Sequence, residues 1–150
     1  MAGLQWTAKP TTEVALAAAT AKTVLQVKAP ANQRVKIKGW GVYFDGTSVS
    51  AEAINVKLVR QSTAGTMSSV TPAKCDDSLP ETVQSTASVN ASVEPTTGDV
   101  LQYRNIHPQS GYEHVYGIQD EDIIKGGGYV GIICDAPAVV NVIPWIKCEE

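Results

Sequence analysis

The chain has 150 residues, a formal net charge of −3 at pH 7, and 18% charged and 6% aromatic residues. A chain of this length suits one domain, which buries roughly 70% of its unfolded surface and needs neither disulfides nor a metal for stability. The slight acidic excess argues against a nucleic-acid partner, because such proteins usually carry a strong basic excess. The chain lacks the run of about 18 apolar residues that a membrane-spanning helix requires, and its N-terminal sequence lacks the pattern of a signal peptide.

Residues 1–12 are mostly polar, and Leu4 and Trp6 are their apolar anchors. We therefore expect an exposed N-terminal arm over 1–12, followed by a single domain over 13–150. The alanine-rich run EVALAAATA (13–21) is short for a stable isolated helix. It is expected to form a strand or an irregular lead-in, with a short helix as the alternative.

The stretch RVKIKGWGVYFDGTSVSAEAINVKLVRQ (34–61) predicts a strand, a turn that begins at Asp45 and a returning strand. Two runs rich in β-branched and aromatic residues flank its polar middle, as expected for strands with one buried face. In the first strand the apolar residues change face near Gly39–Gly41, as expected for a strand that passes from one sheet's core to another environment or bends at its glycines. We expect this strand to serve both the domain core and a neighbouring subunit.

Residues 62–82, STAGTMSSVTPAKCDDSLPET, are expected to form a long loop, and loops of this length are usually functional or mobile. Strands are predicted over 83–93, 100–106, 112–118, 129–134 and 139–146. The last two are nearly continuous in apolar residues, so they are expected to be central, although Pro144 indicates an edge or a bulge. The whole pattern predicts an all-β fold, an antiparallel, jelly-roll-like β-sandwich of eight to ten short strands.

Three cysteines, Cys75, Cys134 and Cys148, are too few and too widely spaced for a disulfide framework or a metal-binding pair. Reduced thiols are expected, as in a cytoplasmic environment, and one disulfide is the alternative. Cys134 lies in an apolar run and is expected to be a small buried hydrophobic residue.

Candidate chemical groups are few. His107 and His114 would face each other if a hairpin joined them, but zinc needs a third and usually a fourth ligand. The acidic runs 76–77 and 120–122 lack the ligand spacing of an EF-hand and are expected to be solvated loop charge rather than a calcium site. Ser110 lies near His107 without a nucleophile elbow or a third partner. The sequence therefore predicts no catalytic residue, no metal and no cofactor.

The aromatic residues offer a different kind of site. Most of them fall within predicted strands, so core or interface packing is expected, and stacking against a sugar is the alternative. They are Trp40, Tyr43, Tyr103, Tyr112, Tyr116 and Trp145.

Several phrases carry a resemblance to a known group of proteins. They are PAN (30–32) with RVKIKGWGVYFDGTS (34–48), VKLVRQSTAGT (56–66) with TP (71–72), EPTTGDVL (94–101) and GGGYVGIICDAPAVVNVIPWI (126–146). Together they resemble small β-sandwich structural proteins of tailed bacteriophages and prophages, and within that group capsid decoration (cement) proteins. The resemblance implies a jelly-roll or related sandwich, trimers on three-fold or quasi-three-fold capsid sites, and no enzymatic activity.

The expected function is therefore that of a non-enzymatic decoration protein, made in the host cytoplasm and located on the capsid surface. Its expected partners are the major capsid protein and further copies of itself, as a homotrimer. Leu4 and Trp6 of the arm and Met67 and Val70 of the 62–82 loop are the expected contact residues. The alternatives are a carbohydrate-binding or host-adhesion module, with a glycan as ligand, and another virion part such as a head-fibre or tail subunit.

Overall fold

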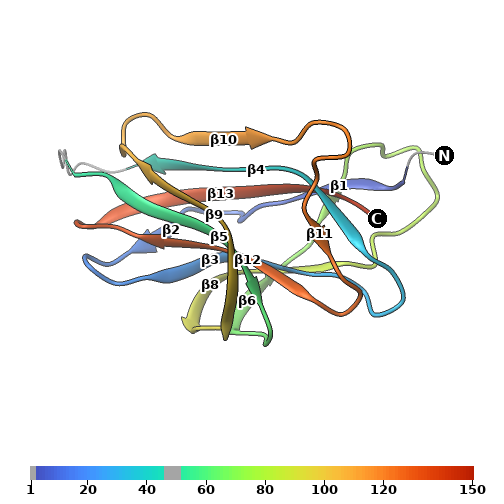
Figure 1. The fold of residues 1–150 in the computed structure, drawn as a ribbon, viewed down its shortest axis with the longest axis horizontal. Helices are drawn as coiled ribbons and strands as arrows, with labels where there is room; N and C mark the ends of the chain where they lie inside the picture. Colours follow the sequence, from blue (N-terminus) through green and yellow to red (C-terminus); the bar gives the residue numbers. More distant parts are fainter. Residues whose placement is uncertain (1–2, 46–51) are drawn as a thin grey trace.

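The computed structural model describes residues 3–45 and 52–150, which form thirteen strands in two antiparallel sheets packed face to face (Figure 1). The strands are β1 (Gln5–Ala8), β2 (Val14–Leu16), β3 (Lys22–Lys28), β4 (Val35–Asp45), β5 (Ile54–Gln61), β6 (Thr66–Val70), β7 (Ala73–Lys74), β8 (Thr86–Val93), β9 (Thr97–Ile106), β10 (Tyr112–Val115), β11 (Ile123–Ile124), β12 (Tyr129–Asp135) and β13 (Val140–Glu149). Within the described ranges there is no helix, and so none that could cross a membrane.

The order of the strands is that of a jelly roll. Sheet 1 runs β10-β4-β13-β1-β7, with β2 also paired to β13 and β11 to β4, and sheet 2 runs β6-β8-β3-β12-β5-β9. Eight of the strands can be renumbered 1 to 8 in chain order: β1, β3, β4, β5, β9, β10, β12 and β13. Sheet 1 then reads 1-8-3-6 and sheet 2 reads 2-7-4-5, which are the two four-stranded sheets of a jelly roll. The predicted all-β sandwich is confirmed. The strand count exceeds the expected eight to ten because β2, β7 and β11, of two or three residues each, are too short to show a periodic pattern.

The two strands predicted from the 34–61 stretch both form, but they do not pair. β4 lies in sheet 1 and β5 lies in sheet 2, so the chain crosses between the layers instead of returning alongside itself. The predicted turn residues 46–48 lie outside the described residues. The expected strand pair was wrong. A hairpin and a connection that crosses between the sheets look alike in the sequence, because each joins two half-buried strands through polar residues.

A β-bulge explains the change of face within β4. Its pairing with β13 joins Gly39 to Lys147 but Ile37 to Cys148, so Lys38 is an extra residue in the ladder. Because the bulge shifts the alternation by one residue, both Ile37 and Trp40 point inward and are fully buried. The change of face expected near Gly39–Gly41 is confirmed, but its cause is the bulge at Lys38 and not a bend at the glycines.

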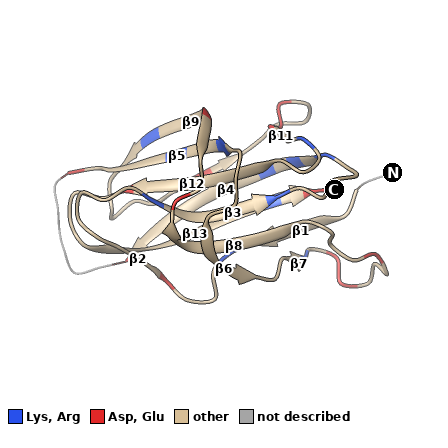
Figure 2. Ribbon diagram, turned by 90° about the horizontal axis from the view of Figure 1, so that it is seen from below, with Lys and Arg blue, Asp and Glu red and all other residues tan. Residues whose placement is uncertain are grey.

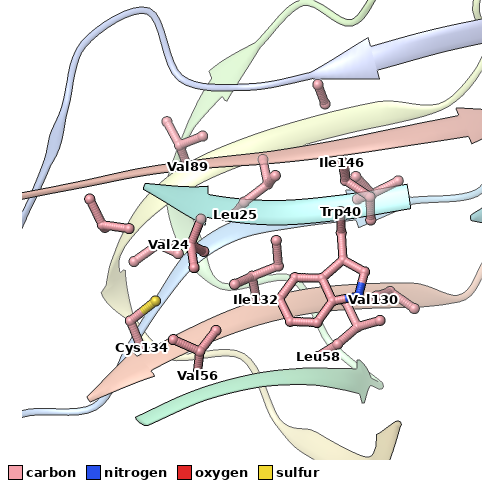
Figure 3. Packing of buried hydrophobic residues seen from close by; sticks show 14 of the residues in the cluster. Val24, Leu25, Trp40, Val56, Leu58, Val89, Val130, Ile132, Cys134 and Ile146 are labelled. Atoms are coloured by element: carbon pink, nitrogen blue, oxygen red, sulfur yellow. The ribbon is translucent and has the colours of Figure 1, made fainter. Parts of the chain in front are cut away.

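The core is one continuous hydrophobic cluster between the sheets (Figure 3). Trp6 and Trp40 from sheet 1 are its largest side chains, and both are fully buried. Sheet 2 contributes alternating residues of β5 and β12, such as Leu58 and Ile132, while Cys134 fills a small space beside Val56. The prediction that Cys134 behaves as a small buried hydrophobic residue is confirmed.

The expected exposed N-terminal arm is wrong. β1 lies inside sheet 1 between β13 and β7, and Trp6 is fully buried. Leu4 is 9% exposed, and its backbone exchanges hydrogen bonds with Glu150 at 2.9 and 3.0 Å. Leu4, Trp6 and Ala8 recur with a period of two, which is the pattern of a half-buried strand. By contrast, the lead-in over 13–21 contains the short strand β2, as expected.

The 62–82 segment is only partly a loop. β6 forms one edge of sheet 2 and β7 forms one edge of sheet 1. Met67 and Val70 lie on β6, both half-buried, and Val70 packs against the core. Ser and Thr dominate β6, so the strand lacks the apolar alternation by which it could have been recognised.

β12 and β13 are central strands, as predicted. Pro144 lies within β13 and pairs with Val42 of β4. On the other side, β2 pairs with Val140–Val142 and β1 pairs with Ile146–Glu149. Pro144 therefore lies between the ends of β2 and β1, where that side of β13 forms no strand pairing that a proline would interrupt. The proline marks this gap inside a central strand, and not the edge or bulge that was expected.

Candidate functional site: the outer face of sheet 1

The four predicted contact residues do not form one site. Leu4 and Trp6 belong to sheet 1 and its core, so they are not presented to a partner. Met67 and Val70 lie on the edge of sheet 2. A different surface, on the outer side of sheet 1, has the features expected of an interface.

That surface has an apolar centre made by three strands. We call it the Trp145 face and define it by Tyr43 of β4, Val115 of β10, and Ile143 and Trp145 of β13. Along β13 the buried positions alternate with these outward ones. Val115 is 74% exposed and Tyr43 is 42% exposed, whereas Ile143 and Trp145 are half-buried against their neighbours on the face. Large apolar residues exposed together often mark an interaction surface.

Gly41 of β4 makes room for the indole of Trp145, whose far end reaches van der Waals distance of Gly39. A Cβ atom on Gly41 would lie 2.6 Å from Trp145 Nε1, and one on Gly39 would lie 3.5 Å from Trp145 Cη2. The indole therefore extends along β4 from Gly41 to Gly39 and rests directly on its backbone. Sequence reasoning identified the glycines as a bend and missed this role. The signal was the motif GWG, in which the two glycines point outward around an inward tryptophan.

The remaining aromatic residues divide between core and surface. Trp40 is fully buried, and Tyr112 and Tyr116 pack against the core from the β10 side, with Tyr112 5.3 Å from Trp40 between ring centroids. Tyr103 on β9 is 49% exposed. The expected core packing is thus right for three of the six aromatic residues, while Tyr43, Tyr103 and Trp145 lie on outer faces.

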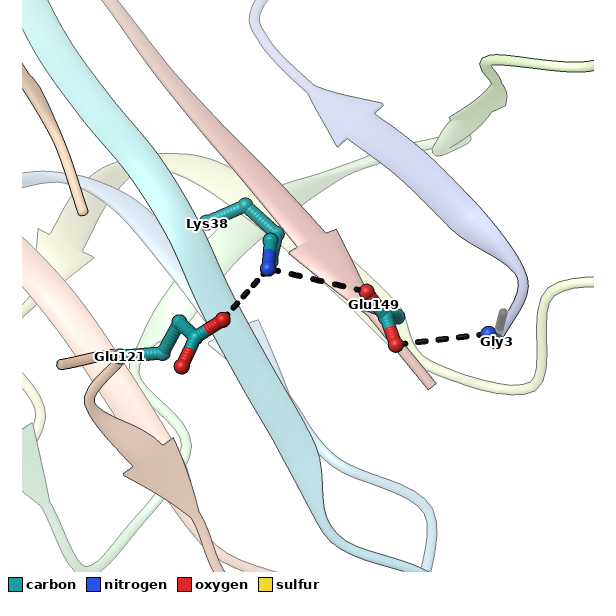
Figure 4. A network of polar contacts seen from close by, with 4 residues as sticks. All are labelled: Gly3, Lys38, Glu121 and Glu149. Carbon is teal, nitrogen blue, oxygen red and sulfur yellow. Dashed lines mark hydrogen bonds and ion pairs between the residues drawn. The ribbon is translucent and has the colours of Figure 1, made fainter. Parts of the chain in front are cut away.

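An ionic cluster borders the Trp145 face at the bulge (Figure 4). Lys38 Nζ lies 2.5 Å from Glu121 Oε1 and 3.8 Å from Glu149 Oε2, and Glu149 also accepts the Gly3 N–H at 3.3 Å. The Glu121 side chain is only 7% exposed. The expected solvated loop charge over 120–122 is therefore wrong for Glu121, and also for Asp122, which accepts a 2.6 Å hydrogen bond from the Tyr116 hydroxyl.

This ion pair is expected to make the free energy of unfolding fall as the pH becomes acidic. The hydrogen bond from Lys38 lowers the pKa of the Glu121 carboxyl, and the same bond raises the pKa of Lys38. The pair therefore stabilises the fold above the ordinary carboxyl pKa of about 4.3, and this contribution is lost as the pH falls through the lowered value. Urea unfolding of Lys38→Met between pH 3 and 7 should show a weaker decline than wild type. Lys36→Met is the control, and equal declines in wild type and Lys38→Met would contradict the assignment.

The polar residues considered for catalysis or metal binding are not assembled. His107 directly follows β9 and His114 lies on β10, and these two strands belong to different sheets. Ser110 Oγ donates to the backbone oxygen of His107 at 3.0 Å rather than to its imidazole. In the part of the chain that the structure describes, no three His, Cys, Asp or Glu side chains are grouped as metal ligands.

A groove of about 650 Å³ opens at one end of the sandwich. Arg60 lies at its wall and donates from Nη1 to the Ile123 oxygen at 2.7 Å. Asp99, Lys125 and Tyr129 add further polar and aromatic groups. The triple glycine (126–128) forms one rim as a tight turn, in which Gly128 N–H donates to Lys125 oxygen at 2.8 Å.

The three thiols are free, as expected, and they differ in exposure. Cys75 is exposed, whereas Cys134 and Cys148 are buried, and burial raises the pKa of both. Because the thiolate is the reactive species, one thiol per chain should react with a disulfide reagent in the native state and three after unfolding. If Cys134 or Cys148 of the native protein reacted with the reagent as fast as Cys75, that result would contradict their burial in the core.

Comparison with known proteins adds no relative. No protein family matches the chain, and neither the curated proteins nor the solved structures contain a match.

Proposed function

We propose that this chain is a non-enzymatic structural protein of a tailed-phage virion, a capsid decoration protein that binds the head as an oligomer and stabilises it. The observation that carries the proposal is the jelly-roll order of the strands, because this architecture recurs in viral capsid proteins. Lectins share it, so the fold alone does not fix the function. The phage-like phrases in the sequence favour the virion.

The surfaces of the molecule are consistent with such a role. A decoration protein must be held by side-chain and sheet-edge contacts. Sheet 2 ends in the edge strand β6, where Met67 is half-buried and no strand of residues 3–45 and 52–150 pairs with the outer side of the ladder. Open sheet edges can pair with another chain. We therefore keep Met67 and Val70 in the proposed head contact and leave out Leu4 and Trp6, which the core encloses.

Co-sedimentation with heads of the source phage that lack the protein tests the proposal. Purified chain should pellet with the heads and saturate at a fixed number of copies per head. Met67→Glu should weaken this binding, because a charge on the contact edge must be desolvated. Val100→Glu, at an exposed position of β9 on the opposite edge of sheet 2, is the matched control. A chain that stays in the supernatant at all head concentrations would overturn the proposal.

A carbohydrate-binding module is the second candidate, and the end groove is the observation that favours it. Tyr129 offers a stacking surface there, beside Arg60 and Asp99 as hydrogen-bonding groups. A glycan array probed with wild type and Tyr129→Ala distinguishes the two functions. Binding to one glycan class that the variant loses would support this candidate over the virion role.

A further inference from the structure

We propose that a second copy of this chain packs on the Trp145 face through a two-fold axis that lies in the plane of the face and crosses the strands. This contact goes beyond the proposed function, because it holds or fails whether or not the chain binds a phage head. It is also distinct from the trimer that the resemblance implies.

The first argument is the arrangement of the face in rows across the sheet. The register aligns Lys147 with Gly39, Trp145 with Gly41, Ile143 with Tyr43, and Asn141 with Asp45. An axis at the level of Val42 exchanges the second row with the third and the first with the fourth. Trp145 of each copy then meets the apolar row of the other. A two-fold contact of this kind is self-complementary, as isologous interfaces require.

The second argument is the charge at the two ends of the face. One end carries Asp45, and Glu13 lies beside it through a 2.9 Å hydrogen bond from Asn141 to the Glu13 carboxylate. The other end carries Lys147, Lys36 and Lys38, with Glu149 and Glu121 as counter-charges beside Lys38, and Figure 2 shows basic positions there on β4 and β13 near the C-terminus. The proposed axis places the acidic end of one copy against the basic end of the other. A parallel arrangement would oppose like charges, so the pattern selects this orientation.

The third argument is area. β4 has 11 residues and β13 has 10, and at about 3.3 Å per residue they extend for about 33 Å. The neighbouring strands are shorter: β10 and β11 along β4 add 6 residues, and β1 and β2 along β13 add 7. With about 4.8 Å between strands, the face has an area on the order of 500 Å². Specific interfaces usually bury about 800 Å² per partner, and about 600 Å² is their lower limit. The face therefore falls slightly below this range, as expected for a weak, reversible dimer with a central aromatic anchor.

Sedimentation equilibrium of the full chain tests the contact. The expected mass corresponds to an even number of copies. Trp145→Ala should raise the dissociation constant at least about 10-fold, because truncating a central aromatic anchor commonly costs more than 1.4 kcal/mol. Tyr103→Ala is the matched control, since that tyrosine is exposed on the other sheet. A mass of one or three copies, or equal effects of the two variants, would overturn the proposal.

Charge reversal gives a test that does not depend on the tryptophan. Asp45→Lys alone and Lys147→Glu alone should each weaken association, because each places like charges opposite one another in both halves of the contact. The double variant Asp45→Lys, Lys147→Glu should restore association toward the wild-type value. A double variant weaker than both single variants would overturn the antiparallel orientation, provided that circular dichroism shows all three folded.

Discussion

Replacing Trp6 with alanine is expected to lower the free energy of unfolding by about 3–5 kcal/mol, the usual cost of removing a large aromatic side chain from a packed core. Trp6 is fully buried in the cluster between the sheets, and β1 holds it there by pairing with both β13 and β7. The loss would be a large part of the 5–15 kcal/mol that stabilises a typical domain. Urea unfolding followed by circular dichroism measures it.

Trp145→Ala is the matched control for this prediction. It removes the same side chain from the same sheet, but from the outer face, where Trp145 is half-buried. Its cost to the unfolding of the single chain should be clearly smaller, and it should be measured at concentrations where the chain is monomeric. A Trp6→Ala variant as stable as Trp145→Ala would show that the N-terminal segment is not part of the core.

The same reasoning changes how the N-terminus should be tested. Deleting residues 1–12 removes β1, so the truncated chain is expected to lose stability and not merely a contact. Loss of head binding by such a truncation would therefore say nothing about a docking arm. Point substitutions on the edge strand β6 are the sharper test of head contact.

Replacing Gly41 with alanine is the second change with a large expected effect, at about 1–3 kcal/mol from overpacking. The added Cβ would lie 2.6 Å from both Trp145 Nε1 and the Tyr112 backbone oxygen. The indole can rotate away, but the backbone oxygen belongs to the paired strand β10 and cannot move without disturbing the ladder. Thermal unfolding should show a lower midpoint.

Gly98→Ala is the control, because its Cβ would come no closer than 3.4 Å to Arg60 oxygen. Both glycines lie in strands, so the change in intrinsic conformational preference is similar. Equal unfolding midpoints for the two variants would contradict the close packing of β10 and Trp145 around Gly41.

The sequence predicted those features that depend on neighbours in the chain. β5 was predictable because Ile54, Val56 and Leu58 alternate with polar residues, and the change of face in β4 was visible in its apolar residues, although the bulge that causes it was not. Trp6 was misread because the polar residues around it resemble a flexible terminus.

Features that depend on distant residues could not be predicted. Lys38 and Glu121 are 83 positions apart, and only the folded chain brings them to 2.5 Å. Trp145 covers Gly41 because the jelly roll places β13 beside β4. The crossing of the chain from β4 to β5 was equally inaccessible, since a turn signal does not specify which sheet the next strand joins.

We propose different contacts for the two sheets, through the Trp145 face of sheet 1 and the β6 edge of sheet 2. In our account sheet 1 joins copies of the chain through its outer face, while the edge of sheet 2 contacts the head. The two contacts lie on different strands, so each can be disrupted without touching the other. Met67→Glu should weaken head binding and leave the oligomeric state unchanged. Trp145→Ala should weaken the association between copies and leave the binding of a single copy to the head unchanged.

Electron cryomicroscopy of source-phage heads, imaged with and without added chain, tests the central claim most directly. The account predicts additional density on the outer head surface at symmetry-related sites, with a size that fits whole copies of the sandwich. Heads that show no additional density at saturating protein concentration would contradict it.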